Sequence, residues 1–221
     1  FNIAIEPAFY GLPFEPVIRL IDSEGNSRTI DLHQEPHDIE FGANENFITD
    51  RIRSRLQSLT QPSTVIDVQL NDLSHHIIRQ TPTPNVTLDD YVSERHWASA
   101  EDGTTVPYDI VRHRGHHGAV PAVIYAYGSY EISLPPWFSV ARLSLLDRGL
   151  AWILVHPRGG GELGRQWYLN GKFLHKRNTF SDVIAATNDA ISRGLIDGER
   201  LAIRGGSAGG LMVGACITMQ P

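Results

Sequence analysis

The chain has 221 residues, of which 41% are hydrophobic and 20% are charged, and its formal net charge is −6 at pH 7. These proportions are typical of a globular protein with one large or two small domains. The negative charge argues against a nucleic-acid partner held by general electrostatics. No apolar run approaches the ~18 residues of a membrane-spanning helix. The single cysteine, Cys216, excludes an internal disulfide and favours a reducing, cytoplasmic location.

Residues 1–84 predict short β-strands separated by turns. The clearest signal is a hairpin around the turn 22–26. Two loosely similar units of about forty residues fit antiparallel propeller blades, and a β-sandwich fits almost as well. The proline-rich segment 81–84 is a stiff linker, so we expect a domain boundary between 1–84 and 85–221. The expected strands cover residues 17–21, 28–32, 47–50, 51–59, 65–70 and 75–80.

Beyond the boundary, predicted strands alternate with predicted helices. Apolar runs at 119–126 and 150–155 are expected to be strands buried on both faces. Helices are expected over 135–147 and 179–193, and a hairpin is expected to join 92–99 to 106–113. Buried strands that alternate with helices indicate an α/β domain with a mostly parallel sheet covered on both faces.

The segment 205–210, Gly-Gly-Ser-Ala-Gly-Gly, lies between a predicted strand at 200–204 and an apolar helix at 211–217. A strand, then G-x-S-x-G, then a helix is the pattern of a nucleophile elbow. In that turn Ser207 projects its hydroxyl at the positive end of the helix, and the Ala208 amide points where an oxyanion would form. The alternative is a glycine-rich turn that contains a serine by chance. The flanking strand and helix favour the catalytic interpretation.

Tyr127 follows the buried strand predicted at 119–126. An acyl-transfer site needs a second oxyanion donor besides Ala208, and in many hydrolases it comes from the loop after an early strand. A phenol is an adequate donor. On spacing alone, however, an aromatic residue whose hydroxyl is satisfied elsewhere is the better interpretation of Tyr127.

Residues 92–221 resemble the peptidase domain of the prolyl oligopeptidase family, and its oligopeptidase B branch in particular. The resemblance implies that Ser207 is the nucleophile and that Tyr127 and Ala208 hold the oxyanion. Ala126 stands where the family usually has glycine, and a methyl group there should be tolerable. The resemblance also implies that residues 1–84 are the last blades of a propeller that covers the catalytic domain. The matching stretches are YAYGSY at 125–130, RLSLLDRG at 142–149, RGGGELG at 158–164, QWYLNGKFL at 166–174, NTFSD at 178–182 and GGSAGG at 205–210.

A serine hydrolase also needs a histidine base and an acid, which follow the serine in this fold. The residues after Ser207 contain no Asp, Glu or His. We therefore expect an internal fragment of a larger peptidase that is inactive alone. His156 is the nearest candidate base in the chain, and the resemblance gives it no such role.

The sequence predicts a serine oligopeptidase that cleaves short peptides by acyl-enzyme formation at Ser207. The resemblance to oligopeptidase B implies cleavage after Arg or Lys. One alternative is another acyl hydrolase of the same fold, such as an esterase or an aminopeptidase-like enzyme. The other is an inactive module that binds partners. A truncated sheet would expose an edge, through which we expect self-association.

No cofactor or metal is expected. The glycines of 159–164 match a dinucleotide fingerprint, but the following acid, Asp182, falls in the first turn of a predicted helix, where it would favour the helix N-terminus. His33 and His37 are separated by Pro36, which argues against a zinc-binding helix. The adjacent pairs at 75–76 and 116–117 point to opposite faces of a strand. Two interpretations of Glu162 stay open: an acidic surface near the site, or an ion pair with Arg158 or a neighbour.

Overall fold

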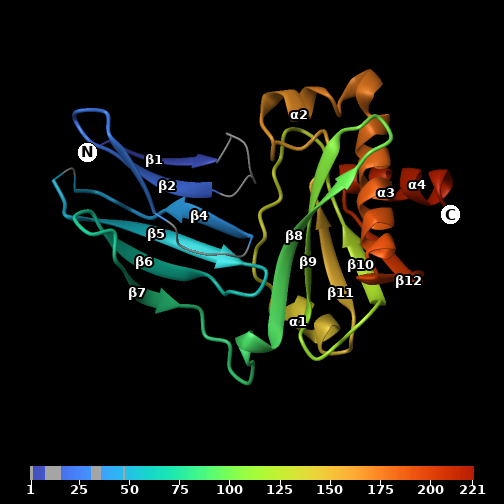
Figure 1. Cartoon of the computed structure of the whole chain (residues 1–221), viewed down its shortest axis with the longest axis horizontal. Helices are drawn as coiled ribbons and strands as arrows, with labels where there is room; N and C mark the ends of the chain where they lie inside the picture. Colours follow the sequence, from blue (N-terminus) through green and yellow to red (C-terminus); the bar gives the residue numbers. More distant parts are fainter. Residues whose placement is uncertain (1, 8–15, 31–35, 47) are drawn as a thin grey trace. The chain divides into compact units, whose positions relative to one another are not determined.

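The computed structural model describes residues 2–7, 16–30, 36–46 and 48–221, and of residues 2–7 it describes the backbone alone. The chain divides into two compact units (Figure 1). One comprises Phe1–Leu88 with Pro135–Ser139, and the other comprises Asp89–Leu134 with Val140–Pro221. The identities assigned to the two expected domains remain predictions.

The first unit contains two antiparallel sheets. The predicted hairpin is confirmed, with Ile18 opposite Ile30, although positions 31 and 32 of its second strand lie outside the described residues. The strand expected at 47–50 is wrong where it can be judged, because 48–50 have no strand structure and 47 lies outside the described residues. Two strands, at Asn2–Pro7 and His37–Phe41, were not expected. The sheets are β1 (Asn2–Pro7), β2 (Pro16–Ile21) and β3 (Ser27–Ile30), and then β4 (His37–Phe41), β5 (Arg51–Ser58), β6 (Thr64–Gln69) and β7 (His75–Gln80), each in chain order.

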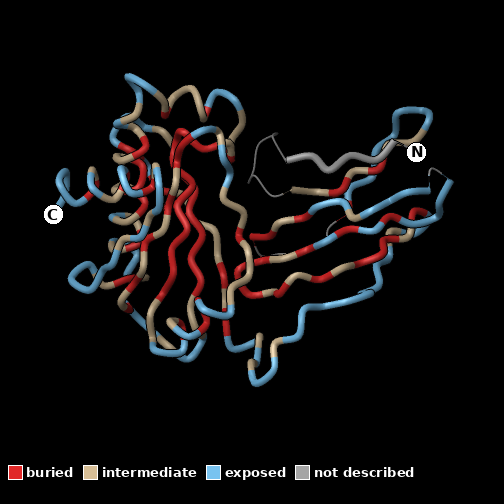
Figure 2. The backbone as a smooth tube through the Cα atoms, turned by 180° about the vertical axis from the view of Figure 1, so that it is seen from behind, coloured by how far each residue is buried: buried red, intermediate tan, exposed pale blue. Residues whose placement is uncertain are grey.

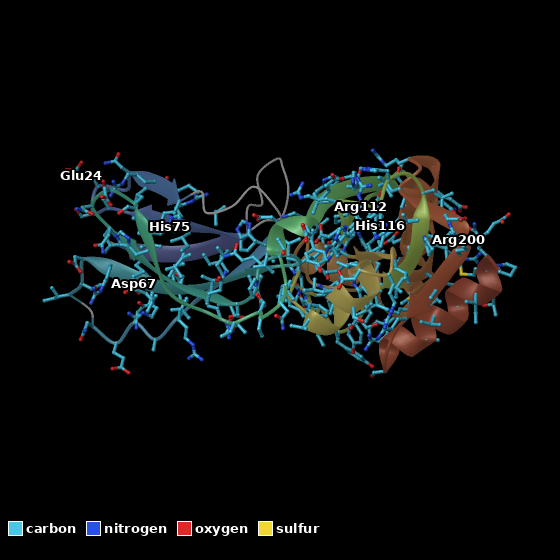
Figure 3. All side chains as sticks on the ribbon, turned by 90° about the horizontal axis from the view of Figure 1, so that it is seen from below. Glu24, Asp67, His75, Arg112, His116 and Arg200 are labelled. Carbon is cyan, nitrogen blue, oxygen red and sulfur yellow. The ribbon has the colours of Figure 1, made fainter. Side chains whose placement is uncertain are left out.

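The pattern of β5 shows why this unit folds as sheets. Its even-numbered residues, including Ile52 and Leu56, are buried, whereas the intervening arginines are exposed. Such alternation directs one face of a strand to the core and the other to solvent. Asp67 on β6, which is labelled in Figure 3, is charged but nevertheless buried. Arg53 Nε donates to Asp67 Oδ1 at 2.7 Å, and this pairing lowers the pKa of the Asp67 carboxyl.

A five-stranded sheet forms the centre of the second unit, and its inner strands are among the most buried parts of the backbone (Figure 2), whereas the end strand at Ile196–Arg204 is mostly exposed. The strand order is β12-β10-β11-β9-β8. All five strands overlap the segments predicted from the sequence. Their bounds are β8 (Tyr91–Ser99), β9 (Thr105–His113), β10 (Val120–Tyr125), β11 (Ala151–Val155) and β12 (Ile196–Arg204).

The sheet is mixed rather than mostly parallel. β10 pairs in parallel with β11 and β12, but β9 is antiparallel to both β11 and β8. The physical reason is that the predicted hairpin of β8 and β9 joins this same sheet. A tight turn can only connect antiparallel neighbours, whereas parallel strands need a longer crossover.

Helices cover both faces of this sheet. α3 (Arg177–Ser192) and α4 (Ala208–Met219) pack with Ile153 and Val155 on one face. α1 (Val140–Leu146) packs against β9 and β11, and it begins later than predicted, because Pro135–Ser139 are not helical. The short helix α2 (Arg165–Leu169) and the 3₁₀ turns at Leu88–Asp90 and Phe173–His175 were not predicted. Among the described residues, no helix is long and apolar enough to cross a membrane.

Candidate active site

Three parallel strands end together at one edge of the sheet in the second unit. Tyr125, the last residue of β10, is in register with Leu154 of β11 and with Arg204 of β12. The loops that follow these strands therefore emerge at the same edge. In open α/β sheets this carboxyl edge is where ligands bind. Two predicted site residues, Tyr127 and Ser207, lie just beyond the ends of the neighbouring strands β10 and β12.

Ser207 occupies a sharp turn between β12 and α4. Its φ is 54° and its ψ is −122°, a combination that glycine dominates in turns. A serine at the N-cap of a helix usually bonds an amide of the first turn, but the Ser207 hydroxyl makes no such bond. The residue is exposed. The hydroxyl is thus displayed to solvent at the positive end of α4.

Close packing explains the glycine before the turn. A β-carbon on Gly205 would lie 2.3 Å from the carbonyl oxygen of Gly209, so only glycine fits there. Ala208 is the first residue of α4. Its amide has no partner within the helix, as is general for the first turn. The structure therefore brings the Ser207 hydroxyl and the Ala208 amide together at one helix end.

The loop after β10 lies against the start of α4. A β-carbon on Gly209 would be 3.1 Å from the carbonyl oxygen of Ala126 and 3.6 Å from Cδ2 of Tyr127. Tyr127 is half-buried, and its ring is 6.5 Å from that of the exposed Tyr130. The expected oxyanion donor is accordingly next to the helix end that carries Ser207 and Ala208.

The loop after β11 is held by ion pairs of the buried Arg158. Arg158 Nη2 lies 2.6 Å from Asp182 Oδ1, and the Arg158 amide donates to Asp182 Oδ2 at 2.8 Å. Arg158 also pairs with Asp102, whose pKa falls to about 2 chiefly because of this hydrogen bond. Asp182 is buried in the second turn of α3, so the expected role at the helix N-terminus is wrong. Its carboxylate instead anchors the loop.

His156 and Glu162 belong to a separate buried network. His156 is fully buried, and its Nε2 is 3.0 Å from Asp109 Oδ2. Arg95 also binds Asp109, through Nε at 2.6 Å. Burial alone would lower the pKa of His156, but Asp109 and Glu162 raise it above its ordinary value. Because Ser207 is exposed and His156 is enclosed, this histidine is not placed to act on the serine hydroxyl.

Of the two interpretations of Glu162, the structure supports an interaction with a neighbouring side chain and not an acidic surface. The residue is buried, its Oε1 is 3.6 Å from His156 Nδ1, and the same oxygen accepts a hydrogen bond from the Leu134 amide at 3.1 Å. It does not pair with Arg158, which binds Asp182 and Asp102 instead. Glu162 therefore ties two loops together.

The histidine pairs form no metal site in the described part of the chain, where no group of three or more His, Cys, Asp and Glu side chains could hold an ion. His75 and His116, both labelled in Figure 3, belong to different units. His116 packs against His113, with ring centroids 5.3 Å apart. His33 lies outside the described residues.

Sequence reasoning missed the residues that support the loop after β10. Lys176 and Thr179, at the start of α3, both hydrogen-bond to the backbone of that loop. Thr179 falls within one of the stretches noted for resemblance, but no local pattern marks either residue as a partner of Gly128. The contact joins positions 48 and 51 residues apart in the chain.

The chain is similar to known proteins in both sequence and structure. Residues 136–221 match the model of the prolyl oligopeptidase family. Dipeptidyl aminopeptidase BI of Pseudoxanthomonas mexicana is 38% identical over 92% of the chain, and protease 2 of Moraxella lacunata is 32% identical over 89%. The structure of oligopeptidase B from Leishmania major superposes with a TM-score of 0.82 at 32% identity, over 94% of this chain and 31% of that one.

The chain belongs to the prolyl oligopeptidase family. It spans 29% of the length of each of the two curated relatives named above.

Proposed function

We propose that this protein is a serine peptidase that cleaves short peptides through an acyl-enzyme at Ser207. The observation that carries the proposal is the conformation of Ser207. Its left-handed backbone displays an uncapped, exposed hydroxyl at the start of α4, beside the Tyr127 loop. Backbone strain of this kind persists where a surrounding structure enforces it, and it concentrates at functional sites.

In the proposed reaction the Ser207 oxygen attacks the peptide carbonyl carbon while its proton passes to a base. The carbonyl oxygen becomes an oxyanion, which accepts hydrogen bonds from the Ala208 amide and the Tyr127 hydroxyl. Collapse of this intermediate breaks the carbon–nitrogen bond, and the base returns the proton to the leaving amine. Water then hydrolyses the Ser207 ester by the same steps.

We propose that the base and its orienting acid come from sequence outside these 221 residues. Among the described residues, no histidine or carboxylate hydrogen-bonds to the Ser207 hydroxyl, and His156 is enclosed with Asp109. The five-stranded sheet fits the first part of an α/β-hydrolase domain. The four-stranded meander β4–β7 fits a propeller blade.

For the substrate we propose peptides cleaved after Arg or Lys, supported by the similarity to oligopeptidase B. The test is hydrolysis of arginyl and alanyl amides and an acyl ester by the natural full-length protein, with Ser207→Ala as control. A fluorophosphonate probe should label the wild type at Ser207. Activity or labelling retained in Ser207→Ala would overturn the assignment of the nucleophile. A large preference for the ester in kcat/KM would overturn the peptidase assignment.

A second candidate activity is removal of dipeptides from the amino end of a peptide. The observation that favours it is the 38% identity to a relative named dipeptidyl aminopeptidase BI. The two activities differ in their need for a free amino terminus. Dipeptidyl arginyl amides with free and with blocked amino groups separate them, since an endopeptidase accepts both and an aminopeptidase accepts the free form alone.

We also infer that these 221 residues, expressed alone, associate through the edge at β12. This strand is the end member of the sheet. Beside it a groove of about 340 Å³ is lined by apolar residues that include Ile184, Leu201 and Ile217. Open strand edges and apolar grooves favour pairing with another chain. Light scattering that finds a monodisperse monomer would contradict this inference.

A further inference from the structure

The ammonium group of Lys176 lies against the loop that carries Tyr127. Its Nζ donates to the carbonyl oxygen of Gly128 at 2.5 Å and to Ser129 Oγ at 2.7 Å. Gly128 and Ser129 are both buried, and Lys176 is half-buried. In the described part of the chain, Lys176 has no ion pair with a carboxylate. A charged donor to a neutral carbonyl makes a stronger bond than a neutral donor.

The position of Lys176 disfavours a role in stabilising its own helix. The residue is the N-cap of α3, where the positive end of the helix dipole repels a cation. Burial adds to the cost and lowers the pKa of the ammonium group. A neutral N-cap residue would serve α3 better, so the contacts with residues 128 and 129 explain why a lysine suits this position.

Thr179 completes the support for the loop. Gly128 has a φ of +65°, and a β-carbon there would lie 2.4 Å from Thr179 Cγ2 and 2.8 Å from Pro157 Cγ. The buried Thr179 hydroxyl donates to the carbonyl oxygen of Arg158 at 2.5 Å. The Gly128 peptide is thus enclosed between the start of α3 and the loop after β11, and Lys176 holds its carbonyl oxygen.

This support acts on the residue immediately before Gly128. Tyr127 lies beside Gly209 at the start of α4 and is covalently joined to Gly128, whose carbonyl oxygen Lys176 holds. We propose that Lys176 is a positioning residue that fixes Tyr127 so that its hydroxyl meets the oxyanion. This role rests on the proposed function. It acts through Tyr127 and involves no contact between Lys176 and the substrate.

The test compares kcat and KM for an arginyl amide in the natural full-length protein. Lys176→Met should lower kcat about tenfold and leave KM unchanged, because the oxyanion exists only after attack. Tyr127→Phe should lower kcat by about 10²-fold, as loss of one oxyanion donor does. In the Tyr127→Phe background, Lys176→Met should cause no further loss. Lys172→Met, a nearby lysine that stacks on Tyr168, is the matched control and should retain the wild-type kcat.

The outcomes are distinguishable. An equal loss of kcat from Lys176→Met with and without the Tyr127 hydroxyl would mean a general structural effect and would overturn the proposal. If Lys176→Met does not fold, Ser129→Ala removes one of the two lysine contacts and should lower kcat about twofold to threefold only when Tyr127 is present. Activity that survives Ser207→Ala overturns the proposed function and this role with it. Activity that requires Ser207 but is unchanged in Lys176→Met overturns the role of Lys176 alone.

Discussion

Replacing Ser207 by glycine should make the protein more stable than replacing it by alanine. With φ at 54° and ψ at −122°, any side chain at this position is held in a conformation that costs on the order of 1–3 kcal/mol. Glycine relieves that cost but loses about 0.5–1 kcal/mol through the greater freedom of the unfolded chain. The difference predicts that Ser207→Gly is more stable than Ser207→Ala by about 1 kcal/mol.

Urea denaturation of the two variants measures this difference directly, because both lack the hydroxyl and differ only at the β-carbon. In a thermal melt, the same gap corresponds to about 2–4 °C for a domain of 150–250 residues. An equal or lower stability of Ser207→Gly would refute the reasoning and would mean that the turn is not strained.

Ser181 provides the control of opposite sign. It lies within α3, where its hydroxyl bonds the Arg177 carbonyl at 3.2 Å. In a right-handed helix, glycine is less stable than alanine by about 1 kcal/mol. Ser181→Gly should therefore be less stable than Ser181→Ala. The reversal between the two sites separates strain at the turn from a general effect of glycine.

Three further predictions concern packing, protonation and thiol reactivity. Gly205→Ala should lower the free energy of unfolding by about 1–3 kcal/mol, because the added methyl group clashes with the backbone. Gly210→Ala should not, because its methyl group meets open space. Equal urea midpoints for the two variants would contradict the packing argument. The folded pKa of His156 is raised by Asp109 despite burial. The stabilisation by charged His156 should be complete below its unfolded pKa of ~6.5 and should be lost as pH rises through its folded pKa. In urea titrations, the free energy of unfolding of His156→Gln should therefore fall less over this pH range than that of the wild type. An equal fall in both proteins would argue against this role of His156. Burial raises the pKa of the Cys216 thiol to about 11, so iodoacetamide at about pH 8 should label it only after unfolding, and rapid labelling of the folded protein would be inconsistent with this.

The sequence alone was sufficient for features that depend on neighbours in the chain. The turn residues that separate short β segments predicted a strand at 51–59, where β5 lies, and the apolar runs at 119–126 and 150–155 predicted the buried strands β10 and β11. The glycines around Ser207 predicted a strand–turn–helix junction, which the structure has. These predictions hold because strand alternation, helix periodicity and turn chemistry are local properties.

The tertiary structure decided the pairings and the partners of buried charges. A hairpin motif does not specify which sheet its strands join, and only the fold showed that β8 and β9 make the sheet mixed. Asp182 looked like a helix-end acid, yet it anchors Arg158 from 24 residues away. Lys176 and Gly128 show the same limit. Their contact depends on how α3 packs against the loop after β10, because burial and long-range hydrogen bonding are set by the whole fold rather than by residues adjacent in the chain.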